Sequence, residues 1–183
     1  MEAQLKKILR YLSVKQLMED IADLNGVMSV RRFVRFETDG FLVSYTHGDG
    51  KIGVLVDCPK GTEEVAKDVC MQIAAAKPEY LNREEVPQDV VSHEMEILKA
   101  QAMNEGKPAE IAEKMVQGRI QKFYKEICLA EQAFIKDGDL SVAKYVANNG
   151  GEILKMVRYE VGEGMEKRND NFAEEVMNQV KGN

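Results

Sequence analysis

The sequence predicts an α+β fold: an antiparallel sheet of three to four strands, covered by helices, with an antiparallel helical hairpin projecting from it. Three observations lead to this prediction. Runs rich in Val, Ile, Phe and Tyr cluster between residues 30 and 57 instead of alternating with helices. Helical patterns, with apolar residues three and four positions apart, flank that cluster. Two of these patterns, within residues 87–128, are separated only by Gly106-Lys107-Pro108, so they are expected to fold back on each other.

The chain is acidic and long enough to bury a core of its own. Its 183 residues allow one domain with appendages, and the formal charge is −6. An acidic chain without a long basic run is not typical of proteins that bind nucleic acid or anionic membranes, so we expect neither partner. No apolar stretch approaches the ~18 residues of a bilayer-spanning helix. The N-terminus also lacks a clean signal-peptide core and cleavage site.

The three cysteines indicate a reducing compartment. Cys58, Cys70 and Cys128 do not have the spacing of metal ligands, and an odd number leaves one unpaired in any disulfide scheme. We therefore expect reduced thiols, a cytoplasmic location, and neither a metal nor another cofactor.

Residues 26–86 are expected to form the core sheet and one helix, after an N-terminal helical lead-in over residues 1–25. The predicted strands form an antiparallel meander and are Val30–Phe36, Phe41–Thr46 and Lys51–Asp57. Alternating apolar residues in the last strand imply a layer of helices over one face of the sheet. A helix that begins at Thr62 or Glu63 and ends at Lys77-Pro78 supplies this layer. Its predicted buried stripe is Val65, Val69, Ile73 and Ala76.

The helical hairpin is expected over residues 87–128. Gly106 suits the left-handed residue that ends a helix, and Pro108 suits the first position of the next one. The facing apolar rows are predicted to be Val91, Met95, Leu98 and Ala102 on the first helix, and Ile111, Met115, Ile120, Phe123 and Ile127 on the second. Charged residues on the remaining faces indicate an arm that stands in water.

Residues 129–168 are expected to complete the core, and residues 169–183 to form a C-terminal helix. The tract from Glu131 to Gly138 is irregular, with a short extended part. Ser141 is a suitable cap for a short helix, and Ile153–Val161 is predicted as the last strand.

Catalytic motifs are scarce in this chain. It has two histidines and no Cys-His pair at local spacing, and GxSxG, HExxH and Walker-type sequences are absent. His93 lies beside Glu94 and Glu96, which is typical of a solvated helix face. His47 lies in a glycine-flanked turn between strands, where it is either a solvent-facing residue or a contact for a partner. We predict no catalytic or metal-binding residue, and residue chemistry alone favours a binding protein over an enzyme.

Five collinear runs cover nearly everything after Asn25. They are SVRRF (29–33), SYTHGDGKIGVLV (44–56), MQIAAAKPEYL (71–81), NEGKPAEIAEKMVQGRIQKFYKEICLAEQAF (104–134) and RYEVGEGMEKRNDNFAEEV (158–176). Together they resemble bacterial elongation factor Ts, the nucleotide-exchange factor of elongation factor Tu.

The chain also departs from that family. It contains neither a TGAGMMDCKKAL-like helix nor a TDFV-type motif. Lys60-Gly61-Thr62-Glu63-Glu64, which follow a strand end similar to the one before that motif, supply no Thr-Asp-Phe sequence. The resemblance therefore implies the C-terminal portion of the factor: the second core subdomain, the helical hairpin and the C-terminal helix. Whether the chain is a piece of a longer protein, a natural short form or a diverged paralogue stays open.

The resemblance implies a partner and its contacts. The partner is elongation factor Tu, in its GDP-bound and nucleotide-free states, and the expected contact at the turn is made by Tyr45, His47 and Gly48. A second contact is implied in the C-terminal helix, at Phe172, Glu174 and Val176. The implied activity is release of GDP from Tu without covalent catalysis, impaired here because the N-terminal half is missing. The alternative is a self-association module, a homodimer without exchange activity.

Overall fold

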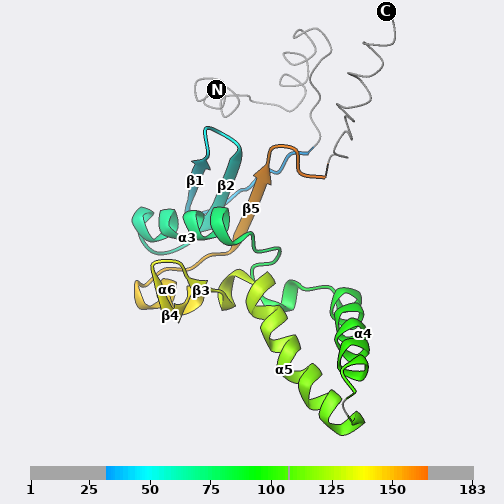
Figure 1. Ribbon diagram of the computed structural model, residues 1–183. Coiled ribbons are helices and arrows are strands. Elements are labelled where there is room, and N and C mark those ends of the chain that lie inside the picture. Colours follow the sequence, from blue (N-terminus) through cyan, green and yellow to red (C-terminus); the bar gives the residue numbers. More distant parts are fainter. Residues whose placement is uncertain (1–31, 107, 165–183) are drawn as a thin grey trace, which may run out of the picture.

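A three-stranded antiparallel sheet, a helix that covers it and a long helical arm make up the computed structural model, which describes residues 32–106 and 108–164 (Figure 1). The elements are, in chain order, β1 (Phe41–His47), β2 (Ile52–Cys58), α3 (Glu63–Ala76), α4 (Gln88–Asn104), α5 (Ala109–Ile127), β3 (Ala133–Phe134), β4 (Asp137–Ser141), α6 (Val142–Asn148) and β5 (Lys155–Glu160). Single 3₁₀ turns at Arg83–Glu85 and Leu129–Glu131 flank the arm. The predicted α+β class is confirmed.

The sheet has the strand order β1-β2-β5, and both pairings are antiparallel. β1 and β2 form a hairpin in which His47 pairs with Ile52. Its turn is tight because the Lys51 N–H donates to the Gly48 carbonyl at 3.1 Å. Asp49 and Gly50 have φ of 55° and 88°. Positive φ at both central residues is characteristic of the hairpin turn whose twist matches that of the flanking strands. The two predicted strands are therefore confirmed to within a residue.

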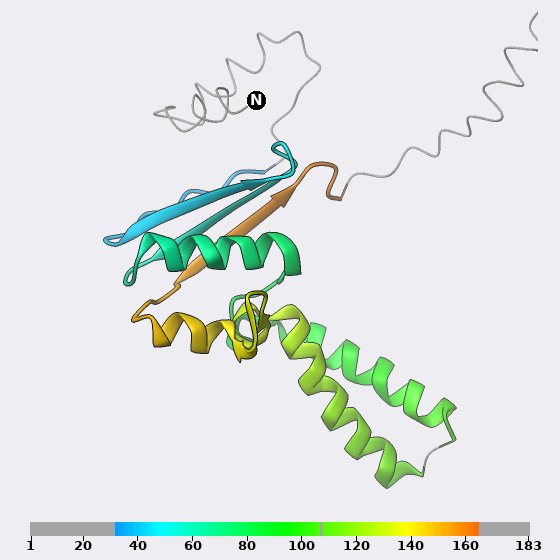
Figure 2. The ribbon, with the colours of Figure 1, turned by 60° about the vertical axis from the view of Figure 1, so that its left-hand side comes forward.

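The predicted strand Val30–Phe36 is wrong over its described part, because residues 32–36 form no strand. The third strand of the sheet is β5, from the other end of the chain, and it occupies the second edge of β2. Residues 32–38 instead cross the sheet face opposite α3 (Figure 2). There the guanidinium of Arg32 lies 4.8 Å from the centre of the Tyr159 ring. The β-propensity of residues 30–36 indicates only a strand-like composition. β2 has two edges, and both are occupied, one by β1 and the other by β5.

One close approach fixes the entry into β1. A Cβ added to Gly40 would lie 2.4 Å from the Cys58 carbonyl oxygen and 2.6 Å from the Pro59 Cα. Only glycine fits where these two backbone segments pass each other.

α3 packs on β1 and β2 and forms the main core with them. Thr62 caps its start, since its hydroxyl accepts from the Val65 N–H, and Lys77 ends it with φ of 51°. The buried residues of this core on the sheet and on α3 are Val43, Val54, Val56, Cys58, Val65, Ala66, Val69, Cys70, Ile73 and Ala74. Ala76 is exposed, contrary to the prediction. The buried residues of α3 lie in two adjacent rows along the helix, and Ala76, in the last turn, lies at the edge of these rows.

The arm is the predicted antiparallel hairpin, and Gly106 has the expected left-handed conformation with φ of 72°. Pro108 caps α5 instead of occupying its first position. Val91, Leu98 and Ala102 of α4 are buried as predicted. Ile111 is 48% exposed, however, and the buried row of α5 is Ala112, Val116 and Ile120. The predicted row and the buried row are both apolar in the sequence. The row that is buried in the hairpin is the one that begins with a small residue, Ala112.

The segment after the arm completes the core as expected in outline. The irregular tract forms the two-stranded β3–β4 hairpin, and the Ser141 hydroxyl caps α6 by accepting from the Lys144 N–H. β5 confirms the predicted last strand. The expected helices over residues 1–25 and 169–183 lie outside the described residues.

The cysteine thiols provide a test of the protein interior, since Cys58 and Cys70 belong to the main core and Cys128 to the buried cluster of the arm. All three are free and buried, and burial raises the pKa to about 11 for Cys58, about 12 for Cys70 and about 11 for Cys128. A thiol with a raised pKa is protonated and unreactive at about pH 8. We expect a thiol-specific chromogenic disulfide to react with none of them in the native chain, and with all three in concentrated guanidinium chloride. Rapid native labelling would show that the core is open.

Candidate partner-binding site

The turn between β1 and β2, here called the sheet tip (residues 47–51), presents its side chains to solvent. His47 is exposed at the end of β1. Gly48, Asp49 and Gly50 follow with φ of 60°, 55° and 88°. A side chain at Gly48 would be strained in this conformation. The hydrogen bond from the Lys51 N–H to the Gly48 carbonyl closes the turn, and the tip projects from the end of the sheet.

The structure brings together Tyr45, His47 and Gly48, the three residues expected at this turn. The Tyr45 hydroxyl oxygen lies 2.9 Å from Nδ1 of His47. The two rings are 5.9 Å apart between centroids and tilted by 34°. Strand alternation puts both side chains on the same face, and the half-buried Tyr45 ring packs against the main core. Tyr45 thus connects the exposed imidazole to the core. The expected contacts Phe172, Glu174 and Val176 lie outside the described residues.

The arm lies at the opposite end of the molecule from the sheet tip (Figure 1). Two buried glutamines link it to the core, with side chains of Gln72 on α3 and Gln132 after α5 only 1% and 5% exposed. Gln72 Nε2 donates to Gln132 Oε1 at 3.1 Å, and Gln132 Nε2 donates to the Glu126 carbonyl at 2.7 Å. The Ile135 N–H donates to Gln72 Oε1 at 2.8 Å. The amide groups therefore tie α3, the end of α5 and the segment after β3 into one unit.

The base of the arm is held a second time by the segment before α4. The Leu129 N–H donates to the Tyr80 carbonyl at 2.9 Å and the Ala130 N–H to the Leu81 carbonyl at 3.0 Å. Arg83 forms an ion pair with Glu131, and its guanidinium lies 4.4 Å from the centre of the Tyr124 ring. The pairing with Glu131 raises the pKa of Arg83, so its charge is permanent. Both ends of the arm are consequently anchored at one place.

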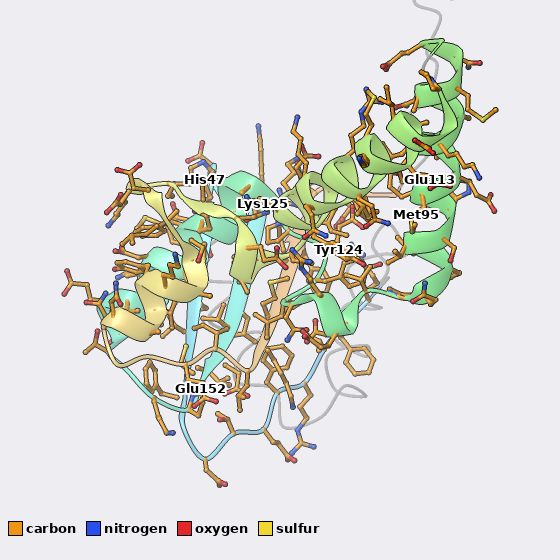
Figure 3. The ribbon with its side chains drawn as sticks, turned by 90° about the horizontal axis from the view of Figure 1, so that it is seen from below. His47, Met95, Glu113, Tyr124, Lys125 and Glu152 are labelled. Carbon is orange, nitrogen blue, oxygen red and sulfur yellow. The ribbon has the colours of Figure 1, made fainter. Side chains whose placement is uncertain are left out.

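A groove of about 820 Å³ runs along one side of the arm. Met95 and Val116 provide its apolar lining, and Glu96, Lys99, Glu110, Glu113, Lys114 and Gln117 surround them. Met95 and Glu113 can be followed in Figure 3. The sequence did not indicate this groove, because its charges alternate in sign and no periodicity distinguishes them from an ordinary solvated face.

Two features, a metal-binding group of side chains and a membrane-spanning helix, are absent from the described part of the chain. Over residues 32–106 and 108–164, no group of three or more His, Cys, Asp or Glu residues is arranged to hold a metal ion. Within the same ranges no helix has the length and apolar character needed to cross a membrane. His93 is exposed on α4, as expected of a solvated helix face.

Comparison with known proteins agrees with the family resemblance of the sequence. The sequence model of the family described as Elongation factor TS matches residues 3–163. Elongation factor Ts of Clostridium botulinum strain Eklund 17B / Type B is 53% identical over 172 residues, covering 87% of this chain and 57% of that protein. The same-named protein of strain Alaska E43 / Type E3 is 52% identical with the same coverage. That of Syntrophomonas wolfei subsp. wolfei is 48% identical over 183 residues, covering 92% of this chain and 86% of that protein. The chain thus spans little more than half the length of the two Clostridium relatives.

The buried glutamine pair can be tested by truncation. Gln132→Ala removes an amide that bonds to α3 and α5, and leaves buried partners without hydrogen bonds. We expect the free energy of unfolding to fall by about 1–3 kcal/mol, measured by urea denaturation. Gln121→Ala, at an exposed position of α5, is the matched control and should change it by less than about 0.5 kcal/mol. Equal effects of the two variants would contradict the role of the pair.

Proposed function

Since this chain belongs to the elongation factor Ts family, we propose that it binds elongation factor Tu and takes part in the release of GDP from Tu. The observation that carries this proposal is the sheet tip, where His47 and Gly48 are exposed and the half-buried Tyr45 holds the His47 imidazole through a contact of 2.9 Å. A protein partner can use such a group because little ordering entropy is lost when it binds. A further contact through Phe172, Glu174 and Val176 belongs to the same proposal.

The proposed activity requires binding energy and no covalent chemistry. An exchange factor releases a nucleotide by binding the nucleotide-free state of its partner more tightly than the nucleotide-bound state. By linkage, GDP must weaken the complex by the same factor with which the factor weakens GDP binding. A thousandfold effect corresponds to about 4 kcal/mol of coupling. The sheet tip and the arm, at two ends of this molecule, provide separated surfaces that such a difference in affinity can use.

We further propose that exchange by this chain is slow compared with that by the longer Clostridium relatives. The sequence has no TDFV-type motif, and the chain spans 57% of the first of these relatives. The sheet tip would still bind Tu, but without the TDFV-type motif. We place this activity in the cytoplasm, in line with three free, buried thiols.

A second candidate function, self-association, is favoured by exposed apolar side chains near the sheet face opposite α3. Leu42 of β1 is 42% exposed on that face, and Phe33 and Val34, in the segment that crosses it, are 62% and 42% exposed. Apolar surface of this kind favours association with a second copy through an isologous contact. A homodimer and Tu binding at the sheet tip use different surfaces.

GDP release from Tu tests the first proposal. We expect the chain to bind Tu loaded with a fluorescent GDP analogue and to accelerate release in stopped-flow experiments, though less than the long C. botulinum relative does. His47→Ala should weaken binding to Tu about tenfold, as for a contact at the centre of an interface. His93→Ala, on the exposed face of α4, is the control and should behave as wild type. Absence of any binding to Tu would refute the proposal.

Light scattering tests self-association. If the apolar face mediates a homodimer, the wild type should have twice the chain mass and Leu42→Glu should reduce it to that of a monomer. Ile97→Glu, which places the same charge on the arm at a position 38% exposed, should leave the mass unchanged. A wild type that stays monomeric at high concentration would exclude this function.

A further inference from the structure

The two nitrogens of the His47 imidazole have different surroundings. Nδ1 lies 2.9 Å from the Tyr45 hydroxyl oxygen. Nε2 has no hydrogen-bond partner among the described residues, and the exposed ring carries it at the sheet tip. The cross-strand neighbour of His47 is Ile52, which offers no polar side chain. Only one of the two nitrogens is therefore open to an external group.

Tyr45 is in a position to determine which nitrogen carries the proton. A neutral imidazole has one N–H donor and one acceptor nitrogen. A phenol is a stronger acid than a neutral imidazole N–H, and an imidazole nitrogen is a stronger base than a phenol oxygen. The favoured arrangement therefore has the Tyr45 O–H donating to Nδ1 of His47. The imidazole proton then lies on Nε2, because the partner of one ring nitrogen sets the state of the other.

The position of the Tyr45 hydroxyl is itself fixed. The Tyr45 ring packs against the buried cluster that includes Val43 and Val54, so its rotation is restricted. The strand step of two residues brings the His47 ring against it, at 5.9 Å between centroids. The hydroxyl thus orients an imidazole that would otherwise rotate freely in solvent.

We propose that Tyr45 is a positioning residue, which holds His47 as the Nε2–H tautomer and directs that N–H outward to an oxygen acceptor of the partner, a backbone carbonyl or a carboxylate. This inference rests on the proposed function, because it takes the partner to be elongation factor Tu. It adds the atom that makes the contact, its role as donor, and the reason why the ring is oriented before the partner arrives. Orientation in advance lowers the entropy lost on binding.

Four single variants and one double variant of the full chain separate the two nitrogens in a binding titration with Tu. His47→Gln keeps an amide N–H near the position of Nε2, whereas His47→Asn keeps one near Nδ1. We expect His47→Asn and His47→Ala to weaken binding about tenfold and His47→Gln only two- to threefold. Tyr45→Phe, which removes only the hydroxyl, should weaken binding about threefold, and should have no further effect when His47 is already alanine.

Nitrogen-15 NMR of the histidine side chains reports the tautomer without the partner. Wild type should show a protonated Nε2 and an unprotonated Nδ1 at His47, and Tyr45→Phe should give a mixture, while His93 stays the same in both. A protonated Nδ1 in wild type, or full affinity of Tyr45→Phe when His47→Ala binds weakly, overturns the positioning role alone. If the NMR result is as expected but no His47 variant changes affinity for Tu, the proposed contact itself is refuted, and this inference with it.

Discussion

The buried amide pair Gln72–Gln132 is the constraint on which the shape of this molecule depends. An arm of two helices can be stable along its own length and still point in any direction, since its internal contacts do not involve the core. The two amides remove that freedom by bonding α3, the end of α5 and the segment after β3 together inside the protein. Buried amides that find all their partners specify one arrangement, because any other leaves them unsatisfied.

Because the direction of the arm is fixed, the arm and the sheet tip lie at a defined spacing from each other. A factor that works by preferring one state of its partner has to distinguish two arrangements of that partner. A rigid body that contacts two places does this, because it fits only one of the two spacings. The tip is closed by the Lys51–Gly48 hydrogen bond and supported by the Tyr45–His47 contact. The arm base is held by Arg83 and by the backbone pairing of Tyr80 and Leu81 with residues 129 and 130. The exchange by differential affinity that we propose is consistent with this arrangement.

Much of the fold and part of the site could be predicted from the sequence. The start of α3 at Thr62, the arm break at Gly106 and the cap of α6 at Ser141 are local features of caps and turns, and all three are confirmed. The grouping of Tyr45 with His47 came from the family resemblance, and strand alternation in the structure explains why the two side chains meet. The arm groove around Met95 could not be predicted, because it depends on how two amphipathic helices are rotated about their axes.

Within residues 32–106 and 108–164, the sequence by itself determined which segments are helical and close to where they end. It also determined the family to which the chain belongs. Caps, periodicity and long motifs are encoded over neighbouring residues. Only the tertiary structure decided that β5 and not residues 32–36 completes the sheet, and that Ala112 and not Ile111 faces α4. In both cases two segments or rows of similar composition competed for one place. Pairing and packing over long distances selected between them, and local propensity carries no information about that choice.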